Sequence, residues 1–175
     1  PPLRCARLAV GLALVVFVVG RGEPARACAL LRPAAQDYGK IDMGTGAANA
    51  QGALALCYAD VQRAAERDRA LGQARELRSR TTFRGQVFMA DLALIELKGP
   101  PSQAAASLIE FADDADRRSW VLPALEARLA ALRLLEQGDD ATRALALRKR
   151  ISSEARARGF GWVLARATGT SRSVH

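Results

Sequence analysis

The chain has 175 residues and a net charge of +8, and half of its residues are apolar although only 5% are aromatic. A core rich in Ala and Leu favours closely packed helices over sheets, which need more β-branched and aromatic side chains, and this length suits a single core. The only histidine is His175, and the three cysteines are widely spaced. The sequence therefore predicts no Ser-His-Asp or Cys-His catalysis, no cofactor and no histidine or zinc site.

Residues 1–27 have the features of a signal peptide. Two arginines precede the apolar run 8–19, and Ala25 and Ala27 place small residues where a signal peptidase reads them. The run is shorter than the roughly 20 residues that a helix needs to span a bilayer. We expect an exported protein, periplasmic or extracellular, without a stable membrane span after cleavage. The alternative is that the segment is retained as a membrane anchor.

Residues 28–46 are predicted to form a loop or linker, because this stretch contains several turn-forming Gly, Pro and Asp residues. It begins at Cys28, which with Cys57 forms a pair suited to one disulfide in an oxidising compartment. Burial of Cys57 as a small core residue is the preferred interpretation. Gly44-Thr45-Gly46 is treated as loop, because no strand precedes it and no Gly-Lys-Ser/Thr follows.

Residues 47–168 are predicted to be helical throughout. Apolar side chains recur every three or four residues in the segments 47–79, 86–98, 102–115, 120–137, 141–158 and 159–168. Segment 47–79 is consistent with one long helix or with a hairpin whose break lies near residues 67–69. Sharp stops follow at Gly99-Pro100-Pro101 and Gly138-Asp139-Asp140. Residues 169–175 are predicted to be a flexible tail.

Two hairpins have similar sequences around their turns. Leu94-Ile95-Glu96 and Leu134-Leu135-Glu136 each precede a turn, and a small-residue helix start follows. The starts recur about every 35 to 40 residues, as in helical-hairpin repeats. Glu96 and Glu136 occupy equivalent positions, which favours a shared structural role, such as pairing near a turn, over catalysis.

These hairpins resemble those of tetratricopeptide-repeat proteins, particularly the divergent terminal repeats of bacterial arrays. The resemblance covers residues 86–167 and includes a closing helix that begins Gly159-Phe160-Gly161-Trp162. It implies an all-α fold of stacked antiparallel hairpins, with a non-repeat helical bundle as the alternative. It also implies a non-catalytic module that binds a protein or peptide on a concave surface. The polar residues expected to face that ligand are Asp91, Glu126, Arg128 and Arg133.

Two other functions are consistent with the sequence. An Arg-rich binder of nucleic acid would need the basic residues of the segment 141–158 to share one face, namely Arg143, Lys149, Arg150, Arg156 and Arg158. A small carboxylate enzyme would need two acids that converge in a cleft. The acidic cluster Glu110, Asp113, Asp114 and Asp116 lacks the ligand spacing of a calcium loop and is predicted to be a solvated surface.

Overall fold

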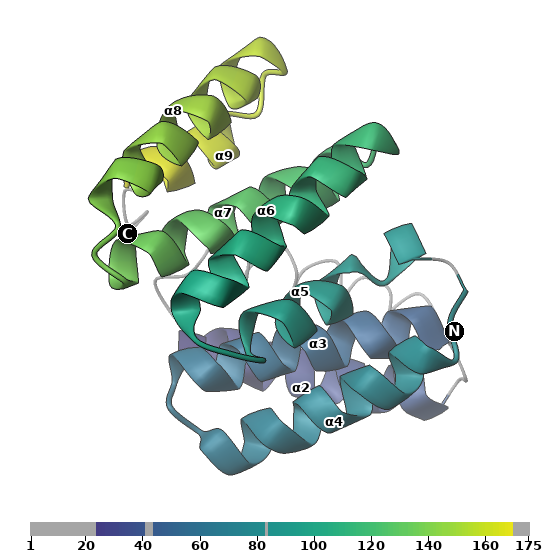
Figure 1. Ribbon diagram of the computed structural model, residues 1–175. Coiled ribbons are helices and arrows are strands. Elements are labelled where there is room, and N and C mark those ends of the chain that lie inside the picture. The colour runs from purple at the N-terminus through teal and green to yellow at the C-terminus, as the bar shows by residue number, and fades with distance from the viewer. Residues whose placement is uncertain (1–23, 41–43, 83, 170–175) are drawn as a thin grey trace. The chain divides into compact units, whose positions relative to one another are not determined.

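The computed structural model describes residues 24–40, 44–82 and 84–169, and within these ranges it contains helices and no strand (Figure 1). The prediction of an all-α fold is confirmed. The chain divides into two compact units between Leu94 and Ile95, so the boundary falls inside the segment predicted as one repeat domain. We call residues 1–94 unit 1 and residues 95–175 unit 2.

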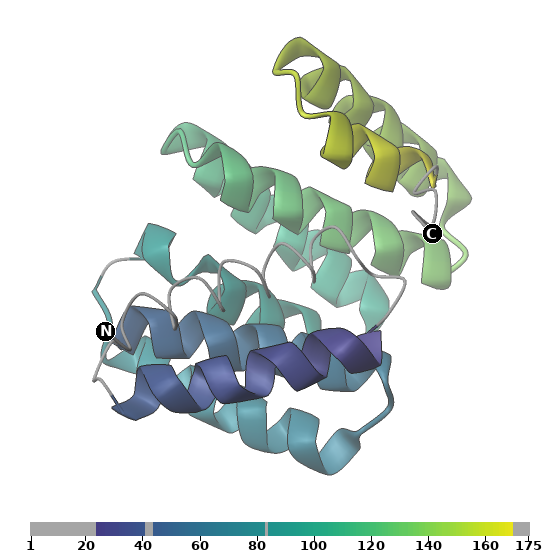
Figure 2. The same ribbon diagram turned by 180° about the vertical axis from the view of Figure 1, so that it is seen from behind.

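Unit 1 contains α2 (Pro24–Lys40), α3 (Gly44–Asp60), α4 (Ala64–Ser79), the short 3-10 helix η1 (Arg84–Gln86) and most of α5 (Phe88–Glu96). α3 packs against both α2 and α4, and the two views of Figures 1 and 2 show these three helices side by side. Cys28 near the start of α2 is bonded to Cys57 near the end of α3. Tyr38 near the end of α2 lies against Gly46 at the start of α3. These two contacts show that α2 and α3 are antiparallel.

The loop predicted for residues 28–46 is wrong over most of its length, because Pro24–Lys40 is helical and α3 already begins at Gly44. Pro24 occupies the first helical position, where the missing N–H has no cost. A stripe of buried side chains at helical spacing then faces α3, namely Ala27, Leu31, Ala34, Ala35 and Tyr38. Burial of this stripe holds the helix together despite the hydrogen bond that Pro33 removes.

The segment 47–79 is a hairpin and not one long helix, and its turn lies at residues 61–63, earlier than the predicted break. Gln62 adopts φ +59°, in the left-handed region. The N–H of Arg63 donates to the Tyr58 carbonyl at 2.9 Å, and the N–H of Gln62 donates to the Ala59 carbonyl at 3.1 Å. This pair of hydrogen bonds is the Schellman motif, which ends a helix and reverses the chain.

α5 approaches α3 closely within unit 1. A Cβ atom added at Gly52 would lie 2.6 Å from both Ala90 Cα and the Met89 carbonyl oxygen, so only glycine permits this approach. Asn49, one turn earlier on α3, accepts a hydrogen bond of 3.1 Å from the Met89 N–H. The contact fixes the start of α5 against the middle of α3.

Unit 2 contains α6 (Pro101–Arg117), α7 (Val121–Gln137), α8 (Ala141–Ala157) and α9 (Gly161–Thr168), and each packs against the next. Their first residues are 101, 121, 141 and 161, so the helices recur every 20 residues and the hairpins every 40. The predicted ends of α7 and α8 at Gly138 and Gly159 are confirmed to within two residues.

The three turns of unit 2 share one geometry with the turn of unit 1. Each has a residue of positive φ, namely Ser119, Asp139 and Gly159. The residue that follows donates its N–H to a carbonyl five positions earlier; these bonds join Trp120 to Ala115, Asp140 to Leu135 and Phe160 to Ala155. The regular spacing therefore comes from helices of one length joined by one type of Schellman turn.

Two of the predictions fall partly or wholly outside the described residues. Of the predicted signal peptide 1–27, the described part is Pro24–Ala27, which forms the first turn of α2. Of the predicted tail, the described part is Gly169, which ends α9 with φ +69°. No helix in the described part of the chain is both long enough and apolar enough to cross a bilayer.

Candidate functional site: a polar groove in unit 1

A groove of about 400 Å³ runs between α2, α3 and α4. Four buried residues form its floor, namely Ala35, Leu54, Tyr58 and Ala70. Its rim is polar and is built by Arg32, Gln36, Gln51, Glu66, Arg69 and Gln73. A hollow with an apolar floor and a few convergent polar groups is the usual form of a binding site.

The two walls of the groove carry the same short pattern. Arg32 and Gln36 lie on α2, and Arg69 and Gln73 lie on α4, four residues apart in both cases. Residues four apart share a face of a helix. Since α2 and α4 each run antiparallel to α3, they are parallel to each other. The groove therefore has an Arg followed one turn later by a Gln on both walls, and Gln51 of α3 lies between the walls.

The groove carries excess positive charge. Arg32 and Arg69 are exposed, and neither forms an ion pair with another described residue. Glu66, the acidic residue of the rim, accepts a hydrogen bond from Arg63. That hydrogen bond, assisted by one from the backbone, lowers the pKa of Glu66, and the field of Arg69 adds to the effect. Glu66 is therefore ionised and already paired, which leaves the two rim arginines available to an anionic ligand.

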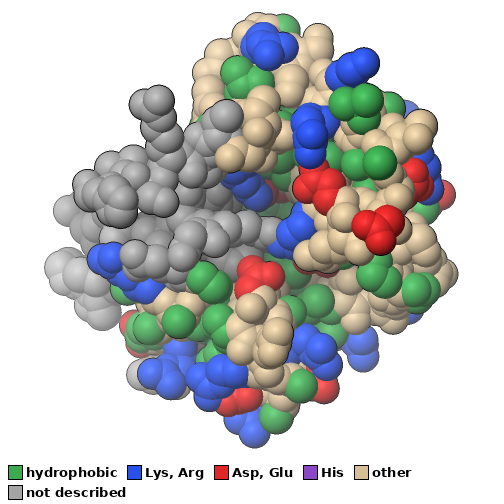
Figure 3. Space-filling model, turned by 90° about the vertical axis from the view of Figure 1, so that its left-hand side faces the viewer, with side chains coloured by type: hydrophobic (Ala, Val, Ile, Leu, Met, Phe, Trp, Pro, Cys, Tyr) green, Lys and Arg blue, Asp and Glu red, His purple; other side chains and the backbone are tan. Residues whose placement is uncertain are grey.

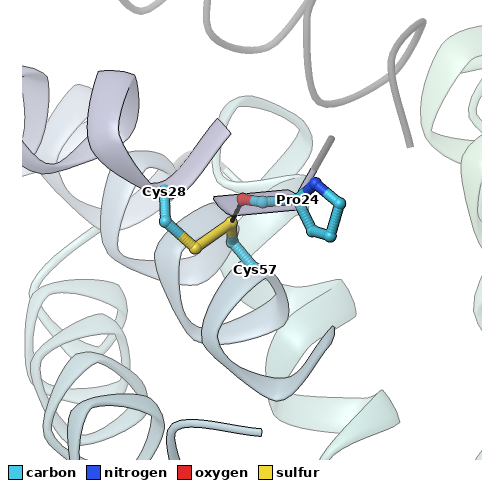
Figure 4. The surroundings of a disulfide bond; sticks show 3 residues. All are labelled: Pro24, Cys28 and Cys57. Atoms are coloured by element: carbon cyan, nitrogen blue, oxygen red, sulfur yellow. Dashed lines mark hydrogen bonds between the residues drawn. A yellow bond between two sulfur atoms is a disulfide. The ribbon is translucent and has the colours of Figure 1, made fainter. Parts of the chain in front are cut away.

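A disulfide fastens the α2 wall of the groove to α3. Cys28 and Cys57 are bonded, with their Cα atoms 5.7 Å apart (Figure 4). The preferred interpretation of Cys57 is a small core residue and not a disulfide partner; its burial is confirmed at 0% exposure, but the disulfide is present as well. The Pro24 carbonyl oxygen lies 3.0 Å from Cys57 Sγ. Because a disulfide sulfur carries no proton, this is a polar contact and not a hydrogen bond.

The four residues predicted to face a ligand have ion-pair partners inside the chain. In unit 1, Asp91 accepts a hydrogen bond of 2.6 Å from Arg78. In unit 2, Glu126 accepts hydrogen bonds of 3.0 and 3.1 Å from Arg166, and Arg133 donates to Glu96. Arg128 is paired with three carboxylates. Glu126 and Arg128 are also buried, at 7% and 1% exposure, so their predicted role in partner binding gains no support.

The carboxylates around Arg128 come from two helices. Asp113 and Asp116 of α6 and Glu154 of α8 all accept hydrogen bonds from its guanidinium. Arg150 of α8 joins the cluster through 3.1 Å hydrogen bonds to Asp113 and Glu154. Burial opposes its charge, but these two hydrogen bonds outweigh that effect and raise the pKa of Arg150. The cluster links α6, α7 and α8.

The acidic residues of α6 remain partly exposed to solvent, as predicted, with side-chain exposures of 42% for Asp113 and 34% for Asp116, although both are also ion-paired. Asp114 is paired as well, with Arg118 at 2.9 Å and Arg117 at 3.2 Å. The hydrogen bond from Arg118 is the main reason that the pKa of Asp114 is lowered. Asp113, Asp114 and Asp116 are therefore both partly exposed to solvent and paired with arginine.

The equivalent glutamates before the two turns are both paired with arginine. Glu96 accepts a hydrogen bond from Arg133, and Glu136 accepts one from Arg148. Both glutamates are therefore paired, but their partners are not equivalent, because Arg133 lies two helices after Glu96 and Arg148 lies in the helix directly after Glu136.

The basic residues of α8 do not gather on one face. With 3.6 residues per turn, Arg143 and Arg150 lie on one side of the helix and Lys149 and Arg156 lie about 120° away. Arg143 is paired with Asp140, and Arg150 belongs to the Arg128 cluster. On the face drawn in Figure 3, basic and acidic side chains are interspersed. This arrangement does not favour nucleic-acid binding through α8.

Within the described ranges, no group of three or more His, Cys, Asp or Glu side chains is arranged to hold a metal ion. Comparison of the chain with protein-family models, with curated proteins and with solved structures finds no match. Its function is therefore inferred from the geometry of the groove. The groove does not follow from the sequence prediction, because one of its walls, α2, lies largely in the segment predicted to be a loop. The repeated Arg-x-x-x-Gln spacing at residues 32–36 and 69–73 is the signal of the groove in the sequence.

Proposed function

We propose that this chain is a non-catalytic, exported helical-hairpin module that binds a segment of a partner protein in the groove of unit 1. The observation that carries the proposal is the composition of the groove: a buried apolar floor beneath a rim that includes three glutamines and two arginines that form no ion pair with a described residue. Such a surface offers an apolar floor and hydrogen-bonding side chains to a polypeptide. The proposed binding surface therefore lies in α2, α3 and α4 and not at the residues first predicted.

The architecture also supports a relationship with tetratricopeptide-repeat proteins at the level of hairpin stacking. A short hairpin cannot bury its apolar face alone, so neighbours must cover it. In unit 2 the second helices of the two predicted hairpins, α6 and α8, begin at residues 101 and 141. This spacing of 40 residues is longer than the roughly 34 residues of a typical tetratricopeptide repeat. The proposal is therefore of tetratricopeptide-like hairpins whose helices are longer than those of a typical repeat.

The disulfide supports export. Disulfides persist in secreted and periplasmic proteins and are rare where thiols are kept reduced. The test is maleimide labelling, in a denaturing buffer that exposes the buried sulfur atoms, of protein taken from the cells that produce it, before and after reduction. Export predicts that Cys28 and Cys57 are labelled after reduction and not before. Labelling of both without reduction would contradict export.

The test of groove binding is site-specific photocrosslinking. A benzophenone amino acid is placed at Gln36 on α2, at Gln73 on α4 or, as a control outside the groove, at the exposed Gln103 of α6. We expect the same partner polypeptide to be crosslinked from both groove positions and not from the control, and excess unlabelled chain should compete. Crosslinks of equal yield from all three positions, or none from the groove, would overturn the proposal.

A further inference from the structure

We infer that the segment bound in the groove is an extended, acidic stretch of the partner polypeptide, an inference that rests on the proposed function. The charge of the rim supports this first. Arg32 and Arg69 oppose a single carboxylate, Glu66, which Arg63 already engages. One arginine on each wall is thus left to bind carboxylates from the ligand. Arginine binds a carboxylate through two parallel N–H···O hydrogen bonds, which are stronger than neutral ones.

The three glutamines indicate that the ligand backbone is extended. Gln36, Gln51 and Gln73 come from three different helices, and each side-chain amide offers both donors and an acceptor. An extended segment leaves its N–H and C=O groups free for such amides, whereas a helical segment uses them internally. The apolar floor then contacts the side chains on one face of the segment.

The groove is less suited to a nucleic acid. Binding of a phosphate backbone depends on several cations along its path, whereas the rim supplies two. Single strands also need aromatic rings on which bases stack. The one aromatic residue of the groove, Tyr58, is 8% exposed, and the Arg63 guanidinium lies 5.4 Å from its ring centre. A protein ligand therefore fits the rim better.

The test uses the full chain and three dye-labelled probes: a ten-residue peptide of alternating Glu and Gly, the matching Gln and Gly peptide, and a single-stranded DNA of ten nucleotides. Binding is measured by fluorescence anisotropy. The double variant Arg32→Gln/Arg69→Gln removes both rim cations. The matched control Arg75→Gln/Arg156→Gln removes the same charge from exposed residues that do not line the groove.

We expect the chain to bind the Glu peptide about tenfold to a hundredfold more tightly than the Gln peptide, as two charge-assisted hydrogen-bonding groups would produce. The rim variant should lose the preference for the Glu peptide and should bind the Gln peptide with the affinity of the unmodified chain. The control variant should keep the preference for the Glu peptide. Circular dichroism should be unchanged in both variants, because all four arginines are exposed.

Other outcomes would overturn the inference. Equal affinity for the Glu and Gln peptides would overturn the inference that the bound segment is acidic. If crosslinking from Gln36 and Gln73 succeeds, the proposed function of the groove in peptide binding would still stand. An equal loss in the control variant would show that net charge alone acts. Tighter binding of the DNA that depends on Arg32 and Arg69 would identify a nucleic-acid ligand. Failure of all probes together with failed crosslinking would end both the inference and the proposed function.

Discussion

Arg128 donates a hydrogen bond of 2.9 Å from Nη1 to Oε2 of Glu154, although its side chain is only 1% exposed. Asp113 and Asp116 accept further hydrogen bonds from Nη2. The Nε atom has no protein partner among the described residues. Burial of a guanidinium costs free energy unless carboxylates surround it. The carboxylates of α6 and α8 therefore allow α7 to hold Arg128 in the interior. The cluster is thus a structural link between the helices of unit 2.

The first prediction concerns this cluster. Arg128→Ala should lower the free energy of unfolding by about 3 kcal/mol, because it leaves three carboxylates facing one another over an unfilled space. Arg150→Ala should cost less than about 1 kcal/mol, since an exposed side chain gains little from ion pairing. Urea unfolding followed by tryptophan fluorescence measures the effect, as Trp120 and Trp162 both lie in unit 2. Equal costs for the two variants would contradict a special role for Arg128.

The helical class and most helix positions in unit 2 could be predicted from local patterns. Gly138 and Gly159 are recognisable stop signals. Between them, the apolar residues that recur at helical spacing in the sequence are mostly buried along α8. The turns at Gln62 and Ser119 have the same left-handed geometry but use residues that give no such signal. The structure reaches that geometry there because packing of the flanking helices outweighs the local preference.

The candidate site could not be predicted, because it depends on two tertiary facts. The helical state of α2 follows from burial of Leu31 and Tyr38 against α3, which residues 28–46 alone do not reveal. The ion-pair partners of the predicted ligand-facing residues lie 12 to 40 residues away in sequence. The pattern of charges in the sequence cannot distinguish a side chain that is available to bind a ligand from one that forms an ion pair within the chain.

The second prediction concerns the close approach of α3 and α5. Gly52→Ala should destabilise unit 1 by about 1 to 3 kcal/mol, because the added Cβ would meet backbone atoms of Met89 and Ala90 that cannot move aside. Gly72→Ala on α4 is the matched control, since a Cβ there meets nothing within 4 Å, and it should stabilise by about 0.5 to 1 kcal/mol. Thermal unfolding by far-UV circular dichroism measures both. A neutral Gly52→Ala variant would contradict the close approach.

The third prediction concerns the shared turn geometry of unit 2. Ser119 and Gly159 occupy equivalent left-handed positions, with φ of +60° and +71°. Ser119→Gly should raise stability, and Gly159→Ser should lower it, each by about 1 kcal/mol, because only glycine adopts this region without a steric penalty. Tryptophan fluorescence in urea compares the two variants. Changes of the same sign would refute the equivalence of the turns.

The fourth prediction concerns the disulfide. Cys28 and Cys57 are separated by 29 residues, and closing a loop of this length stabilises a fold by about 3 to 4 kcal/mol in the chain-entropy model. Reduction of the unmodified chain should therefore lower the stability of unit 1 by about this amount. Hydrogen exchange should accelerate first in α2, the wall that the bond secures. The variant Cys28→Ser/Cys57→Ser provides the control, because it has no bond to reduce, so that the reductant should change neither measurement in it.

The fifth prediction concerns Asp114, whose pKa is lowered chiefly by the hydrogen bond from Arg118 and less by Arg117. Because the pKa in the folded state lies below the ordinary value of 3.8, the pair stabilises unit 2 above that pH, and the contribution is lost as pH falls through the lowered pKa. NMR titration of the Asp114 carboxyl carbon should give a midpoint below 3.8. Arg118→Gln should move the midpoint up towards that value, and Arg117→Gln should move it less. An unchanged midpoint in Arg118→Gln would show that the hydrogen bond does not control the ionisation of Asp114.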